Sequence, residues 1–142
     1  MFGFFKDAAY RADCSSVVQD LILDKLNIGK QSCVEFVEDH KVFFDGAKKN
    51  GYEPGAAVIF IAQQVLFAIN ENRHEQIRSF NNCKHTEVIC LVICYMLLET
   101  DMDKEDKQQL EEAIKSIEKR NNDIIEALSS AFPEQMEKLH QK

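Results

Sequence analysis

The chain has 142 residues, of which 45% are apolar and 29% are charged, and its formal net charge is −7. This length fits one domain, and the ordinary apolar share excludes an intrinsically disordered chain. Seventeen basic residues against twenty-four acidic ones disfavour a nucleic-acid-binding protein, because phosphate binding depends on clustered Lys and Arg. We therefore predict a single acidic domain over residues 1–142.

The first predicted helix covers Phe2 to Asn27. Apolar residues recur there at helical spacing, either as one helix or with an interruption at Ser15-Ser16, where Ser16 and Gln19 have the spacing of a capping box. Gly29 follows and supplies the left-handed conformation that commonly stops a helix.

The second predicted helix starts at Ser32. Ser32 and Glu35 have the spacing of a capping box, in which each side chain bonds the other residue's free amide. One apolar face then continues to Lys48 and Lys49, whose charges suit the C-terminal end of a helix, and Gly51 closes it.

Two nearly all-apolar segments lie in the middle of the chain, at residues 56–69 and 88–98. Pro54 favours the start of a helix before the first, since the first turn tolerates a missing amide donor. Both segments are shorter than the roughly 20 apolar residues that cross a bilayer. We predict them as the central pair of helices, buried by their neighbours and not in a membrane, with a short amphipathic turn between them.

The last long predicted helix carries a heptad pattern from Leu110 to Ala131, and Pro133 then begins a tail helix. Asn121 occupies a core position of this pattern. It would either fix the register of a homodimer or hydrogen-bond a loop within one chain. With no strand signal anywhere, we predict an all-α bundle of five or six helices.

Cysteine usage indicates a reducing compartment. Five cysteines are an odd number, and most fall in apolar helical stretches, so they are expected to pack in the core as free thiols. The N-terminus lacks the basic region and cleavage site of a signal peptide. We expect a cytoplasmic protein. The cysteines are Cys14, Cys33, Cys83, Cys90 and Cys94.

Metal ligation is disfavoured by spacing. Cys90 and Cys94 stand one helical turn apart among core residues, after Cys83 and His85, which favours packing over a zinc site. Acids after Glu99 match part of a calcium loop, but Asp106 replaces its turn glycine. Two Glu-x-x-His pairs lack the further glutamates of a di-iron bundle. These pairs are Glu71 with His74 and Glu137 with His140. We predict no metal and no cofactor.

The function predicted first is a protein-binding module. No nucleophile elbow, phosphate loop or dinucleotide fingerprint is present, so we do not expect an enzyme. The segment from Glu99 to Glu112 has seven acids and two lysines, which would attract a basic protein. A small inhibitor, such as an immunity protein against a toxin, fits this size and charge. The predicted contact residues are Glu99, Asp101, Asp103, Glu105, Asp106, Glu111 and Glu112.

Two other hypotheses stay open. One is a ligand- or metal-binding bundle that uses the space near His40, Cys90 and Cys94, because a histidine in an apolar stripe is either a hydrogen-bonded core group or a binding group. The other is a homodimer that pairs the stripe from Leu110 to Ala131 across a two-fold axis.

Overall fold

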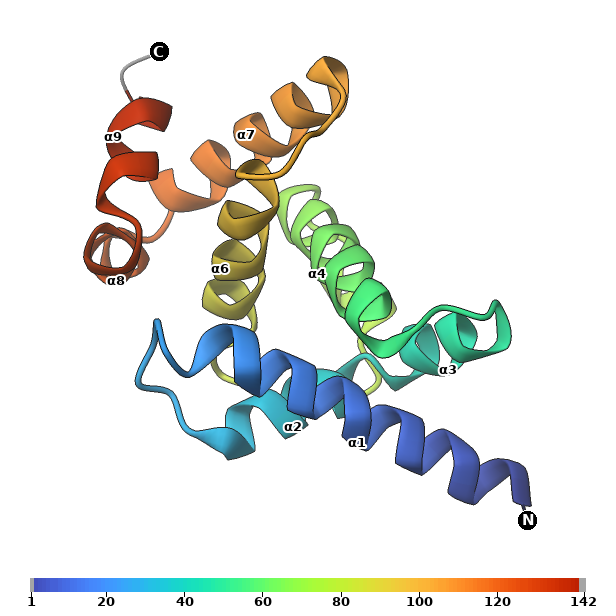
Figure 1. The fold of residues 1–142 in the computed structure, drawn as a ribbon. Helices are drawn as coiled ribbons and strands as arrows, with labels where there is room; N and C mark the ends of the chain where they lie inside the picture. Colours follow the sequence, from blue (N-terminus) through green and yellow to red (C-terminus); the bar gives the residue numbers. More distant parts are fainter. Residues whose placement is uncertain (1, 141–142) are drawn as a thin grey trace.

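The chain is all-helical in a computed structural model that describes residues 2–140 (Figure 1). Within that range no strand occurs, and the helices are nine, not the five or six predicted. The difference arises because two predicted long helices are each broken and the polar middle segment adds a short helix. The helices are α1 (Phe2–Ile22), α2 (Lys30–Asp39), α3 (Lys41–Lys49), α4 (Pro54–Asn70), α5 (His74–Ile77), α6 (Thr86–Leu98), α7 (Lys104–Lys119), α8 (Asn122–Ala131) and α9 (Pro133–His140).

Helices α4 and α6 pack against each other, and α1, α3 and α7 pack around α4 (Figure 1). Pro54 stands in the first turn of α4, as the sequence predicts. In α6 the side chains from Val88 to Tyr95 are all buried, so this helix touches solvent mainly at its two ends. The five cysteines are free and buried, which confirms their predicted role as core residues.

Helix α1 is continuous through Ser15-Ser16, so of the two alternatives the uninterrupted helix is the one observed. The predicted capping box at Ser32 is also absent, because α2 begins two residues earlier, at Lys30. The Ser32 hydroxyl instead donates to the carbonyl of Ile28 at 3.0 Å and lies 2.8 Å from Nδ1 of His85. Gly29 does adopt a left-handed φ of 81°, although it precedes α2 and does not end α1 directly.

The predicted helix from Ser32 to Lys49 is broken at His40. This residue leaves helical geometry, with φ −118° and ψ 28°, and separates α2 from α3. Phe36, Val37 and Phe44 are nevertheless fully buried on either side of it. Core burial is therefore kept across the break, which is why the apolar pattern alone looks like one helix.

The predicted helix from Leu110 to Ala131 is broken at Asn121, where φ is −146° and ψ is 95°. Asn121 is the half-exposed N-cap of α8, outside any continuous seam. Ile117 is fully buried before the break and Leu128 after it. Since α7 packs on α4 and α6, the apolar stripe of α7 is covered by this chain's own core.

Candidate functional site

The acidic segment lies at one end of the molecule, in the loop after α6 and the first turn of α7. Asp101 and Asp103 are exposed in the loop, and Asp103 is the N-cap of α7 without a side-chain cap bond. Glu105 and Asp106 follow, exposed, in the first turn. Acids at this end of a helix are favoured by its dipole, which accounts for part of the cluster. We call these four residues the outer acids.

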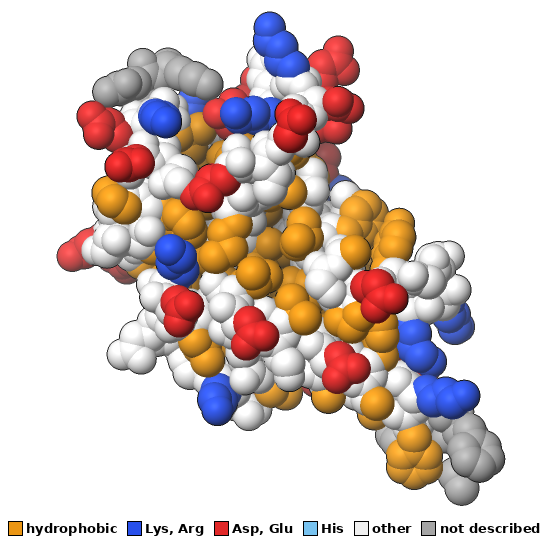
Figure 2. Space-filling view, viewed as in Figure 1, with side chains coloured by type: hydrophobic (Ala, Val, Ile, Leu, Met, Phe, Trp, Pro, Cys, Tyr) orange, Lys and Arg blue, Asp and Glu red, His pale blue; other side chains and the backbone are white. Residues whose placement is uncertain are grey.

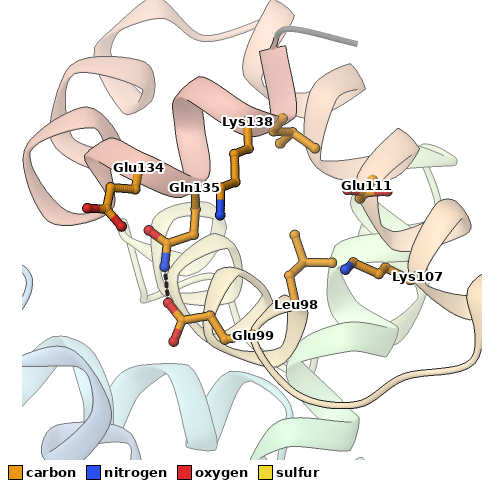
Figure 3. Close-up of a pocket in the computed structure, with 8 residues that line it drawn as sticks. Leu98, Glu99, Lys107, Glu111, Glu134, Gln135 and Lys138 are labelled. Atoms are coloured by element: carbon orange, nitrogen blue, oxygen red, sulfur yellow. Dashed lines mark hydrogen bonds between the residues drawn. The ribbon is translucent and has the colours of Figure 1, made fainter.

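Glu99 and Glu111 have different surroundings from the outer acids. Both line a hollow of about 530 Å³ between the end of α6, α7 and α9 (Figure 3). Lys107 and Lys138 share this hollow, and the Gln135 amide donates to the Glu99 carboxylate. Nearby lysines offset the negative charge there. The full lining is Leu98, Glu99, Lys107, Glu111, Glu134, Gln135, Lys138 and Leu139.

Glu112 lies in a third setting, at a polar hollow between α4 and α7 that Glu71 and Arg73 also line. The seven acids that the sequence predicts as one contact surface are thus spread over three surroundings. The structure keeps the four outer acids together on the outside and places Glu99, Glu111 and Glu112 at hollows formed with other helices.

An open apolar groove lies where α1, α4 and α6 meet, and one of its lining residues, Thr100, directly precedes Asp101 in the chain. Its volume is about 90 Å³. Figure 2 shows apolar side chains gathered over this part of the surface, with acidic side chains around them. Ile59 of α4 is 38% exposed at the groove, and Thr100 is exposed beside it. We call this the α1/α4/α6 groove; it is lined by Leu21, Ile59, Ile93, Met96, Leu97 and Thr100.

Acidic residues neighbour two of the lining residues in sequence, at the C-terminal ends of α1 and α6. Asp20 and Asp24 lie on either side of Leu21 in the chain, and Glu99 and Asp101 lie on either side of Thr100. All four acids are exposed. Lys25 follows Asp24, but its ammonium group lies over the Phe132 ring, 5.3 Å from the ring centre. The groove therefore has an apolar lining, and acidic side chains surround this part of the surface (Figure 2).

A buried polar centre stands at the break between α2 and α3. His40 is fully buried, its Nδ1 lies 2.7 Å from the Phe36 carbonyl oxygen, and its Nε2 lies 2.9 Å from Nε2 of His74. A carbonyl only accepts hydrogen bonds, so Nδ1 of His40 carries the hydrogen. In neutral His40 the Nε2 atom is then the acceptor, and His74 donates to it.

Burial lowers the pKa of both rings. It is the largest cause in each case, and it brings the pKa of His74 to about 4. The positive charge of Arg78 acts in the same direction on both, whereas the negative charge of Asp39 opposes it. The His40–His74 pair is thus held neutral at physiological pH, as a hydrogen-bonded core group.

Asp39 completes this centre. Its buried carboxylate accepts the backbone N–H of Asn82, at 3.1 Å to the nearer oxygen, and that of Cys83 at 2.9 Å. Its backbone carbonyl accepts the N–H of Ser79. These bonds tie the end of α2 to the connection before α6. A hollow of about 390 Å³ lies alongside, lined in part by His74 and Cys83.

A second buried polar centre holds α9 against α6 and α7. The Glu118 carboxylate is fully buried; one oxygen accepts the Tyr95 hydroxyl at 2.6 Å, and the other lies 3.1 Å from Nε2 of His140. The rings of Tyr95 and Phe132 stack at 5.3 Å. Burial, with the adjacent Glu118, raises the pKa of Tyr95 well above its ordinary value. The hydroxyl therefore remains a donor.

The thiols show no sign of activation. Cys90 and Cys94 are fully buried, and burial raises the pKa of both, that of Cys94 to about 12. The hollow beside His74 is lined by Cys83 and includes neither of these two. Across residues 2–140, no three His, Cys, Asp or Glu side chains are grouped so that they could hold a metal ion.

Comparison of the chain with protein-family models, with curated proteins and with solved structures finds no match. In the part of the chain that the structure describes, no helix is long and apolar enough to cross a membrane. The function is therefore inferred from the outer acids, the groove and the hollows of this chain itself.

Proposed function

We propose that the chain is a protein-binding module whose acidic end attracts a basic protein. A small inhibitor of immunity type is the class that its size and charge fit, and the free cysteines favour the cytoplasm as its location. The observation that carries the proposal is the α1/α4/α6 groove, an apolar surface with acidic side chains around it (Figure 2), whose lining residue Thr100 directly precedes the outer acids in the chain. An apolar centre with a polar rim is the common composition of protein interfaces.

The outer acids are suited to steer a partner. Asp101, Asp103, Glu105 and Asp106 are all exposed within one short stretch, with Lys104 as the base between them. Clustered charge of one sign accelerates association with a partner of opposite sign, and salt screens the effect over about 10 Å at 0.1 M. The main contribution is expected in the association rate and its dependence on salt.

The test compares two double charge reversals at helix starts. D103K/D106K reverses the start of α7, and D123K/E126K, the matched control, reverses exposed acids in the first turns of α8. Both variants place lysines near a helix N-terminus, so their costs in helix stability are similar. Association with a partner purified from the native cell is followed by surface plasmon resonance at low and high salt.

We expect D103K/D106K to associate at least about tenfold more slowly than the wild type at low salt, with the difference shrinking as salt rises. The control should remain close to the wild type. Equal association rates for both variants would contradict a steering role for the outer acids.

The second candidate function is a small-ligand-binding bundle. Its specific support is the hollow of about 390 Å³ beside the His40–His74 pair, whose lining includes Arg78 and Lys84 as well as Glu75 and Glu87. Arg78 and Glu75 form an ion pair with each other, so Lys84 and Glu87 are the charges that would meet a zwitterionic ligand. A screen of amino acids and related zwitterions by thermal shift tests it, and ligand stabilisation lost in K84Q would support it over the protein-binding proposal.

A further inference from the structure

We infer that the α1/α4/α6 groove takes one apolar side chain from a basic amphipathic helix of the partner protein. This inference rests on the proposed protein-binding function and names the surface and the kind of partner. The groove is lined almost wholly by aliphatic side chains and methionine, and Thr100 is its one hydroxyl-bearing residue. Its occupant is therefore apolar at the point of contact.

The size of the groove limits what enters it. Sites for drug-sized molecules measure about 300–1,000 Å³, whereas this one measures about 90 Å³. That volume has room for a single anchoring side chain. Interfaces commonly depend on one or a few such anchors in central pockets, surrounded by contacts of smaller energetic effect.

The walls of the groove favour a helix as the carrier of the anchor. Leu21 comes from α1, Ile59 from α4, and Met96 from α6, so three helices converge on the opening (Figure 1). Helices pack by placing a side-chain ridge between the ridges of their neighbours. An amphipathic helix can lay its apolar face there and keep its polar face in water.

Charge selects a basic partner and disfavours the alternatives. Asp20, Asp24 and Asp101 are exposed and lie within three residues of a lining residue in the chain, and Figure 2 shows acidic side chains around the apolar surface. Lysines or arginines that flank the anchor would meet these acids. A second copy of the chain would bring the same acids against themselves across a two-fold axis, and an anionic membrane surface would also be repelled.

The experiment uses synthetic helical peptides as probes. One set has a central Leu, Ile, Met or Phe on an alanine-rich helix with lysines on its other faces. The matched set replaces every lysine with glutamate. Binding to the full chain is measured by fluorescence anisotropy, and the contact surface is located from amide chemical-shift changes in NMR spectra.

Two variants alter the groove, and one serves as a control. I59Q removes an apolar wall at a position that is already partly exposed, and T100W fills the opening from an exposed position. V42Q changes an apolar residue of α3 that is 64% exposed and does not line the groove. Thermal unfolding checks that each variant is folded. If one of the two groove variants does not fold, the other alone is enough to test the groove.

The expected result is that lysine peptides bind and shift amides of α1, α4 and α6, while glutamate peptides do not bind. I59Q and T100W should weaken binding at least about tenfold, and V42Q should leave it unchanged. Lysine peptides that bind both groove variants as well as the wild type would overturn the groove assignment. Equal binding of both peptide sets would contradict the inference that the partner helix is basic.

Failure of this inference is separable from failure of the proposed function. If no peptide binds, or if self-association appears and is lost in I59Q, the groove is not the anchor for a basic helix. The D103K/D106K association measurement would still decide whether the outer acids attract a protein partner. Loss of both effects would remove the protein-binding proposal itself.

Discussion

The two buried polar centres of this chain hold the structure in different ways. At the first, Asp39 receives backbone N–H groups and His40 bonds a backbone carbonyl, so the centre fixes the path of the chain. At the second, Glu118 bonds side chains of α6 and α9, so it fixes how one helix lies on others. Because a buried amide without a partner has no substitute in the core, the first centre should be the more sensitive to mutation.

The largest effect is expected from D39A. This change leaves the backbone N–H groups of Asn82 and Cys83 without their acceptor in a site where Asp39 is 2% exposed. We expect the free energy of unfolding to fall by about 3 kcal/mol. Urea denaturation measures it, with D39N as the control that keeps one oxygen acceptor. A loss in D39A no greater than in D39N would show that these bonds contribute little.

Y95F tests the second centre. The substitution removes the hydroxyl that donates to the buried Glu118 oxygen and leaves the stacked ring in place. We expect a loss of about 2 kcal/mol, because a buried carboxylate oxygen loses its donor. The contrast is H140Q: the His140 side chain is 42% exposed, so water can replace it and the loss should be below about 1 kcal/mol. If urea denaturation showed a larger loss of unfolding free energy for H140Q than for Y95F, His140 would be the main anchor of α9.

Acid should weaken the first centre. The pKa of His40 and His74 is lowered in the folded chain, that of His74 to about 4, from an ordinary value of 6.5. Between these pH values the unfolded chain binds more protons than the folded chain. The contribution of the two histidines to the free energy of unfolding is therefore complete above about pH 6.5 and is lost as the pH falls toward about 4.

The loss is expected to be on the order of 1 kcal/mol, because solvent screens the half-exposed His74. Urea midpoints at pH 7 and pH 5 measure it. The matched variant H74Q should show a smaller fall over the same range, since one titrating ring is absent. An equal fall in both proteins would assign the acid sensitivity to other groups.

Sequence patterns predict the conformation of a residue correctly where that conformation depends on its neighbours in the chain. Pro54 starts α4 and Gly51 takes a positive φ, as the local rules require. The break at His40 is hidden, because Val37 and Phe44 stay buried seven residues apart on its two sides. The same spacing separates Ile117 from Ile124 across the second break. An apolar repeat that survives a break gives no sign of it.

The candidate site shows the same limit. The acids of the α6–α7 connection are visible in the sequence. One of the two lysines that line the hollow with Glu99 and Glu111 is Lys138, which comes from α9, far along the chain. The α1/α4/α6 groove is less visible still. Ile59 and Met96 belong to nearly all-apolar stretches, which mark no outward face. Their partial exposure is decided by how three helices meet.

The smallest effect is expected at the second break, where Asn121 is the N-cap of α8 but makes no side-chain cap hydrogen bond. N121A should therefore cost less than about 0.5 kcal/mol, below the roughly 1 kcal/mol of a bonded cap. N121L is the sharper variant, because a buried Asn in a dimer seam would control the oligomeric state. The stripe of α7 is covered by α4 and α6, so light scattering should give wild type and N121L the same mass. A change in mass would mean that residues 110–131 pair between chains, and that the break at Asn121 closes when they do.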